Sequence, residues 1–169
     1  TFNTWAGFNI HPDHHAFWIS PDDPNYIING NDGGLNITYD GGTTWRYADN
    51  LPLGQFYHIN LDNETPYNIY GGLQDNGSWV GPSSVWRAGG IRNSDWQEIL
   101  FGDGFDAMPR ADDSRYCFAQ SQGGYLSYID RQTGFSQGIQ PVHPEGGKLR
   151  FNWNSGLAQD PFNPKGVYF

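Results

Sequence analysis

The feature that most constrains the fold is an internal repeat with a spacing of about 40 to 50 residues. A shift of 42 residues places Pro24 on Pro66, and a shift of 140 residues places it on Pro164. A shift of 90 residues places Asp40 on Asp130. The chain is therefore expected to consist of successive copies of one structural unit, of 42, 48 and 50 residues.

Each copy has the pattern of four short strands separated by tight turns. In the first copy the strands are HAFWIS, NYIING, LNITY and TWRYA, and the turns are PDDP, NDGG and DGGT. Aromatic and β-branched residues favour strands, whereas Gly, Asn, Asp and Pro favour the turns that join them. A repeat of this length with four strands is typical of a β-propeller blade, so we predict an all-β fold.

The predicted architecture is a β-propeller fragment of about three to three and a half four-stranded blades. The blades cover approximately residues 10–50, 51–98 and 99–148, and a fourth begins at 149–169. Propellers close with about four to eight blades, so these residues are expected to form part of one propeller domain. We expect both ends to be cut from a longer chain, with the remaining blades supplied by that chain or by a neighbouring subunit.

The composition argues against several classes of partner. The chain has 9 Lys and Arg against 18 Asp and Glu, so its formal net charge is −9. A chain this acidic is not expected to bind nucleic acid or to dock on an anionic membrane surface. No apolar run approaches the ~20 residues of a membrane-spanning helix, so we predict no membrane insertion. The single cysteine, Cys117, lies in a predicted strand and is expected to be a buried thiol.

One turn carries a known sequence motif. Residues 38–45, TYDGGTTW, match the Asp-box pattern S/T-x-D-x-G-x-x-W, whose fixed positions are Thr38, Asp40, Gly42 and Trp45. Asp40 is expected to accept hydrogen bonds from turn amides, Gly42 to adopt a conformation closed to larger residues, and Trp45 to pack over the hairpin. A degenerate copy surrounds Asp130 at residues 128–135. The motif indicates a fold and says little about chemistry.

The chain resembles the bacterial Asp-box (BNR-repeat) β-propeller proteins, also described as sortilin-like or "glycosyl hydrolase" BNR-repeat proteins. Beside the Asp-box itself, the segments HPDHHAFWISPDDPNYIINGNDGG, LPLGQFYHINLDNETPYNIYGGLQDNGSW, GDGFDAMP and SQGGYLSYIDRQTG carry the resemblance. It implies a propeller of about seven to ten blades on a larger, usually exported chain, and hence an extracellular or periplasmic location. It implies little about activity, because the same propeller type includes xyloglucanases, sialidases and receptors.

Polar and aromatic residues recur where the chain enters the first strand of each blade, beside the expected central channel. The repeat aligns Asp103 with Asp13, and it places Gln55 and Trp153 at the same position of the other copies. A second set, which follows the second strand, consists of Asp32, Asp75 and Gln122. This second set either caps turn amides or contributes to a ligand site. The candidate ligand-binding residues are His11, Asp13, His15, Gln55, Asp103, Asn152 and Asn154.

The segment HPDHHAFW, residues 11–18, contains a candidate metal set of His11, Asp13 and His15. His14 and His15 point to opposite faces of an extended strand, so they cannot both face one ion unless the backbone turns there. Imidazole and carboxylate ligands would suit Zn²⁺, and a carbonyl-rich loop would suit Ca²⁺; no other cofactor is predicted. The alternatives are a hydrogen-bonded polar pocket and a purely structural role. Trp18 is expected to pack within the blade.

Two classes of function fit these patterns, and the first is favoured. The first is a non-catalytic module that binds a protein, peptide or glycan, or acts as a scaffold in a larger assembly. Trp79, Trp86 and Trp96 are further candidate contacts, although Trp96 begins a predicted strand, which favours packing.

The second class is a glycoside hydrolase of the xyloglucanase type, which requires two facing carboxylates. The candidate catalytic pairs are Asp13 with Asp103, and Asp32 with Asp75. They are chosen because equivalent positions of neighbouring blades face the same channel. One carboxyl of the pair would have to keep its proton in order to act as the acid.

Overall fold

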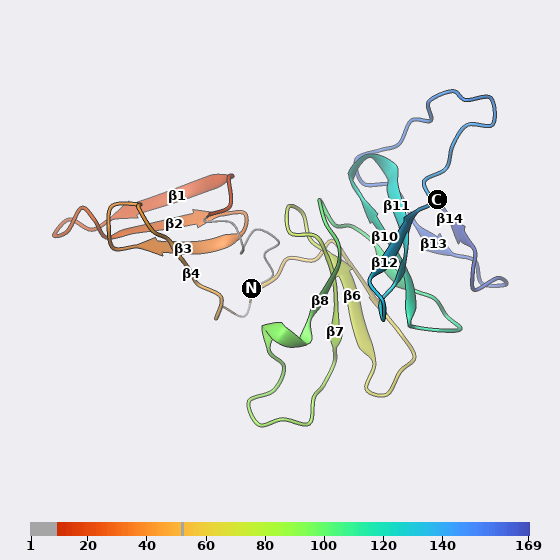
Figure 1. Ribbon diagram of the computed structural model, residues 1–169, viewed down its shortest axis with the longest axis horizontal. Coiled ribbons are helices and arrows are strands. Elements are labelled where there is room, and N and C mark those ends of the chain that lie inside the picture. The colour runs from red at the N-terminus through yellow and green to blue at the C-terminus, as the bar shows by residue number, and fades with distance from the viewer. Residues whose placement is uncertain (1–9, 52) are drawn as a thin grey trace. The chain divides into compact units, whose positions relative to one another are not determined.

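The computed structural model of the chain describes residues 10–51 and 53–169. Its strands form three four-stranded antiparallel sheets and one two-stranded sheet, and neighbouring strands in each sheet follow one another in the sequence (Figure 1). The predicted all-β class, with four-stranded units of the propeller-blade type, is confirmed. The chain divides into two compact units, Thr1–Gly54 and Gln55–Phe169, and each is described by itself.

The strands have the following bounds. The first unit holds one sheet, made of β1 (His14–Ile19), β2 (Ile27–Asn31), β3 (Gly34–Thr38) and β4 (Arg46–Tyr47). The second unit holds β5 (His58–Leu61), β6 (Asn68–Gly72), β7 (Ser78–Pro82), β8 (Gln97–Leu100), β9 (Ala107–Pro109), β10 (Tyr116–Ser121), β11 (Tyr125–Asp130), β12 (Phe135–Gly138), β13 (Ala158–Gln159) and β14 (Val167–Tyr168). Two short 3-10 helices, η1 (Asn93–Asp95) and η2 (Gln122–Gly124), lie between strands. No helix in the described part of the chain is long and apolar enough to cross a membrane.

The same device closes the turn from the first to the second strand in all four sheets. An aspartate side chain accepts the backbone N–H two residues later, which is the geometry of an Asx turn. The four pairs of aspartate Oδ1 and donor are Asp23 with Asn25 at 2.9 Å, Asp62 with Glu64 at 3.2 Å, Asp113 with Arg115 at 3.0 Å and Asp160 with Phe162 at 2.8 Å. The repeated aspartates in the sequence therefore have a shared structural role.

The sheet of the first unit has a polar interior. The side chains of Asn29 and Asn36 are buried, and the amide of Asn31 joins them with hydrogen bonds of 2.7 and 2.8 Å. Buried amides are tolerated when their hydrogen bonds are made, as they are here. The expectation that Trp18 packs within this blade is only partly right. Its ring meets the edge of the Tyr26 ring at 5.5 Å between centroids, yet 48% of the side chain is exposed.

In the second unit, the sheet β5–β8 packs against the sheet β9–β12 through one apolar cluster. The buried residues of this cluster are Tyr70, Val80, Ile99, Ala107, Cys117, Ala119 and Ile129. The prediction that Cys117 is a buried thiol is confirmed, and burial raises the pKa of this thiol to about 12. A thiol that stays protonated at neutral pH behaves as a small apolar side chain rather than as a nucleophile.

A polar network ties the same two sheets together at one edge of this cluster. The Tyr70 hydroxyl donates to Asp62 Oδ2 at 3.1 Å in its own sheet and contacts the Ser114 carbonyl at 3.2 Å in the next. Arg131 reaches back from the end of β11, donating to the Tyr70 hydroxyl and to the Ser114 carbonyl and lying over the Tyr70 ring. The fully buried Tyr70 therefore links the two sheets through its hydroxyl group as well as through its ring.

Candidate ligand-binding site

We call the mouth end of a sheet the end at which the chain enters the first strand and turns from the second strand to the third. These two segments touch each other in every four-stranded sheet. In the first unit, Asp32 N donates to the Asp13 carbonyl at 3.1 Å. In the second unit, Tyr57 N donates to the Gly72 carbonyl at 2.9 Å, and Asp103 N donates to Gln122 Oε1 at 3.0 Å. The two sets of residues aligned by the repeat are thus neighbours within each sheet.

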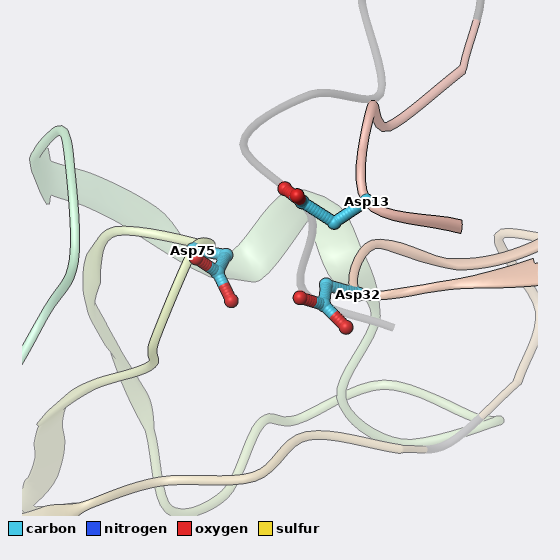
Figure 2. Close-up of side chains that lie close together, drawn as sticks. All are labelled: Asp13, Asp32 and Asp75. Carbon is cyan, nitrogen blue, oxygen red and sulfur yellow. The ribbon is translucent and has the colours of Figure 1, made fainter. Parts of the chain in front are cut away.

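The mouth end of the first unit carries histidine–aspartate pairs. His15 is the extra residue of a β-bulge between His14 and Ala16, and its Nε2 lies 2.5 Å from Asp32 Oδ1. His11 is buried, with its Nδ1 3.6 Å from Asp13 Oδ2. Figure 2 shows the side chains of Asp13 and Asp32 next to each other at this end.

The predicted metal set is divided between these pairs. Among the described residues, His11, Asp13 and His15 do not bring three ligand atoms within 4.8 Å of one another. Instead His11 pairs with Asp13, His15 pairs with Asp32, and His14 Nδ1 lies 3.1 Å from Asn29 Oδ1. The bulge is the physical reason, because it turns His15 toward the loop that holds Asp32.

The mouth end of the second unit is organised by the Asp103 side chain. Its Oδ1 accepts the Asp75 backbone N–H at 3.0 Å, and its Oδ2 accepts the indole N–H of Trp153 at 3.2 Å. Its own backbone N–H donates to the Gln122 side chain. Four positions that the repeat selected from sequence alone, Asp75, Asp103, Gln122 and Trp153, are therefore linked by direct hydrogen bonds.

Three aromatic rings, those of Tyr57, Phe105 and Trp153, pack against one another beside Asp103. Phe105 is fully buried and packs edge-to-face against Trp153, with 4.8 Å between centroids, and in a tilted arrangement against Tyr57, with 5.1 Å between centroids. Tyr57 and Trp153 meet nearly at right angles, at 84°, and keep 41% and 47% of their side chains exposed. Buried support under two half-exposed rings gives a preorganised apolar surface next to a carboxylate.

Local backbone geometry and charge also distinguish this place. Asp75 has φ 63°, in the left-handed region that non-glycine residues seldom occupy. Burial raises the pKa of Tyr57 above its usual value, and the negative charges of Asp103 and Asp75 raise it further. The Tyr57 hydroxyl donates to the side chain of Gln74. The rings thus lie in a negative electrostatic field.

A second polar network is centred on Asp106, the residue after Phe105. His58 Nδ1 is 3.7 Å from Asp106 Oδ1, and Gln120 Nε2 donates to Asp106 Oδ2 at 3.3 Å and to the Ser155 carbonyl at 2.5 Å. These contacts join β5, the segment before β9, β10 and the segment before β13. They link segments of three successive sheets of the second unit.

The other residues predicted from sequence lie in different places. Gln55, Asn152 and Asn154 are exposed, and the Asn152 carbonyl accepts the Ser155 hydroxyl at 3.0 Å. The two candidate catalytic pairs each take one residue from each unit, so the proposed carboxylate pairing stays a prediction. Sequence reasoning missed Tyr57 and Gln74; the available signal for Tyr57 was its position two residues after Gln55 in the aligned segment.

Of the three candidate tryptophans, two have packing roles. Trp96 lies so close to Gly81 that a Cβ on Gly81 would overlap its ring, which confirms the packing expected for Trp96. Trp79 is half-buried and its indole N–H donates to the Asn76 carbonyl at 2.5 Å. Trp86 is fully exposed.

The motif at residues 38–45 forms a tight hairpin turn in the first unit. Asp40 Oδ1 accepts the Thr44 N–H at 2.8 Å and the Thr38 hydroxyl at 2.7 Å, and Oδ2 accepts the Thr44 hydroxyl at 2.6 Å. Gly42 has φ 94°, and the Trp45 ring lies 3.6 Å from the place a Cβ of Gly42 would occupy. These contacts are all local, so they build the turn.

The hairpin is expected to weaken in acid. The hydroxyl and N–H of Thr44, together with the Thr38 hydroxyl, lower the pKa of Asp40 from 3.8 to about 2. The folded-state pKa is the lower one, so the stabilisation is complete above about pH 4 and is lost as the pH falls toward 2. A carboxyl-detected NMR titration should give a midpoint near 2 for Asp40, moving upward in Thr44→Val. A midpoint near 3.8 in the unaltered chain would show that these hydrogen bonds do not form.

Comparison with known proteins adds no assignment. No family model matches the sequence, and no curated protein matches it at a significant level.

Proposed function

We propose that the chain belongs to a non-catalytic binding or scaffold module of a larger extracytoplasmic protein or assembly, and that it binds its ligand at the mouth end of the second unit. The observation that carries this proposal is the pair of half-exposed rings, Tyr57 and Trp153, held by buried Phe105 beside the Asp103 carboxylate. A protein, peptide or glycan is the class of ligand that such a surface accommodates.

Physical chemistry supports this use of the surface. Tyrosine and tryptophan are enriched at binding hot spots because they offer a large apolar area and a polar tip with little side-chain entropy to lose. Loops on a rigid sheet scaffold are the usual carriers of binding residues. Both oxygens of Asp103 accept N–H donors, so its role here is to orient loops and to accept hydrogen bonds.

The wider context is part of the same proposal. The repeated blade-type sheets, the Asp40 hairpin and the shared Asx turns support membership of the Asp-box propeller proteins. On this proposal further blades come from the same longer chain or from a neighbouring subunit, and the protein works outside the cytoplasm. The favoured role is binding, with a glycoside hydrolase as the alternative.

Paired glycan and peptide arrays test the proposal. The chain and its Tyr57→Ala/Trp153→Ala variant should be applied to both arrays, with Trp86→Ala as the matched control because Trp86 is fully exposed on another loop. Loss of hot-spot aromatics costs about 2 kcal/mol or more, so retained ligands should bind the double variant about tenfold or more weakly. Trp86→Ala should bind them as the unaltered chain does.

Two results would overturn the proposal. One is that the unaltered chain retains nothing on either array. The other is that the ligands it retains are held equally by the double variant, which would place binding elsewhere on the chain. Circular dichroism and thermal melting of each variant verify that the fold is kept.

A further inference from the structure

The carboxylate at the mouth end of the second unit faces neutral partners. The donors on Asp103 are the backbone N–H of Asp75 and the indole N–H of Trp153, neither of which carries a charge. Within the described part of the chain, no salt bridge includes Asp103. Each carboxylate oxygen can accept more than one hydrogen bond, so Asp103 keeps both acceptor capacity and negative charge for a ligand.

The aromatic rings beside this charge have the geometry of a cation-binding corner. Tyr57 and Trp153 stand at 84° to each other, with exposed surface on both. A guanidinium or ammonium group over such a ring, within about 6 Å of its centroid, is attracted by the ring quadrupole. A charge-assisted hydrogen bond to a neighbouring carboxylate adds direction to that attraction.

The negative field extends over the corner rather than ending at one carboxylate. The pKa of Tyr57 is raised by burial and then by the charges of Asp103 and Asp75 together, so the field of both carboxylates reaches the ring hydroxyl. The whole chain carries a formal charge of −9, which steers cationic ligands toward it and disfavours anions.

We propose that the mouth end of the second unit binds a basic side chain, an arginine or a lysine, presented by a peptide segment of a protein partner. The cation lies against the exposed rings of Tyr57 and Trp153 and pairs with Asp103 and Asp75. The inference rests on the function proposed above and names the ligand chemistry of that same site.

The test uses a blocked peptide in which arginine alternates with glycine, and a matched peptide with citrulline in place of every arginine. Citrulline keeps the shape and most of the donors of arginine but is neutral. By isothermal titration calorimetry, the arginine peptide should bind about tenfold or more tightly than the citrulline peptide, and raising the salt concentration should weaken it.

The key variant is Asp75→Asn. Asparagine tolerates the positive φ of this position, so the fold should persist while one negative charge is removed. Asp75→Asn should weaken the arginine peptide by about three- to fivefold and leave the citrulline peptide unchanged, because only the charged side chain pairs with the Asp75 carboxylate. The charge-matched control is Asp113→Asn, which removes one exposed negative charge in the turn between β9 and β10, at the opposite end of these strands from the aromatic corner.

The outcomes separate this inference from the proposed function. Equal binding of both peptides, lost in Tyr57→Ala/Trp153→Ala, would overturn the cation inference and leave the binding role intact. If the control variant weakens binding of the arginine peptide as much as Asp75→Asn does, the attraction between peptide and chain is non-specific, and the inference is overturned. Absence of peptide binding up to about 1 mM would also overturn it, and the array experiment then decides whether the binding role falls too.

Discussion

Replacing Tyr70 by alanine is expected to lower the free energy of unfolding by about 3–5 kcal/mol, the range for deleting a fully buried aromatic ring. Tyr70 is completely buried between the sheets β5–β8 and β9–β12, and its ring lies 5.1 Å from the Arg131 guanidinium. The change would leave a cavity in the core and remove the hydroxyl that links Asp62, Ser114 and Arg131. Chemical denaturation of the unaltered chain and the variant measures this difference in the free energy of unfolding.

The Tyr70→Phe variant separates packing from hydrogen bonding. It keeps the ring and the contact with the Arg131 guanidinium but leaves the buried Asp62 carboxylate and the Ser114 carbonyl without the hydroxyl. A buried polar group without a hydrogen-bond partner costs about 1–3 kcal/mol. The free energy of unfolding of Tyr70→Phe should therefore lie between those of the unaltered chain and Tyr70→Ala. Stability equal to that of the unaltered chain would mean that the polar network contributes nothing.

Replacing Gly72 by alanine is expected to be nearly as damaging, with a loss of about 3 kcal/mol or more. Gly72 ends β6 at the point where the segment before β9 crosses it, and a Cβ there would overlap backbone atoms of Gly104 and Phe105. Backbone cannot rotate away as a flexible side chain does, so the two sheets would have to separate. The smaller entropy of the unfolded alanine chain offsets at most about 1 kcal/mol of this.

Gly156→Ala is the matched control for this change. Gly156 is exposed, and a Cβ added to it would meet nothing within 4 Å. Its free energy of unfolding should stay within about 0.5 kcal/mol of that of the unaltered chain. Equal, small effects at both positions would show that the sheets do not approach as closely at Gly72 as described. Because Gly72 sits beneath Phe105, the same variant should also disturb the aromatic corner.

The fold was largely predictable because its information is local and repeated. Asp23, Asp62 and Asp160 each close the same turn through their own neighbours, so the sequence spacing that reveals the repeat also reveals the strand boundaries. The buried state of Cys117 followed from its place in a strand. The exposure of Trp18 did not follow, because alternation shows which residues share a face but not whether that face is covered.

The site was predictable in part. The repeat picked out Asp75, Asp103, Gln122 and Trp153, and the structure links them, because equivalent loops of neighbouring sheets meet at one end. The aromatic partners were harder to select. With 17% aromatic residues in the chain, Tyr57 and Phe105 stand out from the others only by lying two residues after the aligned positions Gln55 and Asp103.

The histidines show a second limit of sequence reasoning. Pairing of His15 with Asp32 depends on a one-residue bulge in β1. A bulge changes the direction of the side chains near it without changing the alternating pattern from which directions are inferred. The alternating pattern therefore groups His11, Asp13 and His15 on one face. In the structure, His15 instead pairs with Asp32.

The most direct test of the claim that the mouth end of the second unit binds a cationic side chain is an NMR titration of the Trp153 indole N–H. That resonance is assigned by its loss in Trp153→Phe, and its hydrogen bond to Asp103 makes it a reporter of the site. On addition of the arginine peptide, the chemical shift of this resonance should change progressively and reach a plateau. The citrulline peptide should cause almost no change in this chemical shift. A Trp153 resonance that does not move while the arginine peptide binds would contradict the claim.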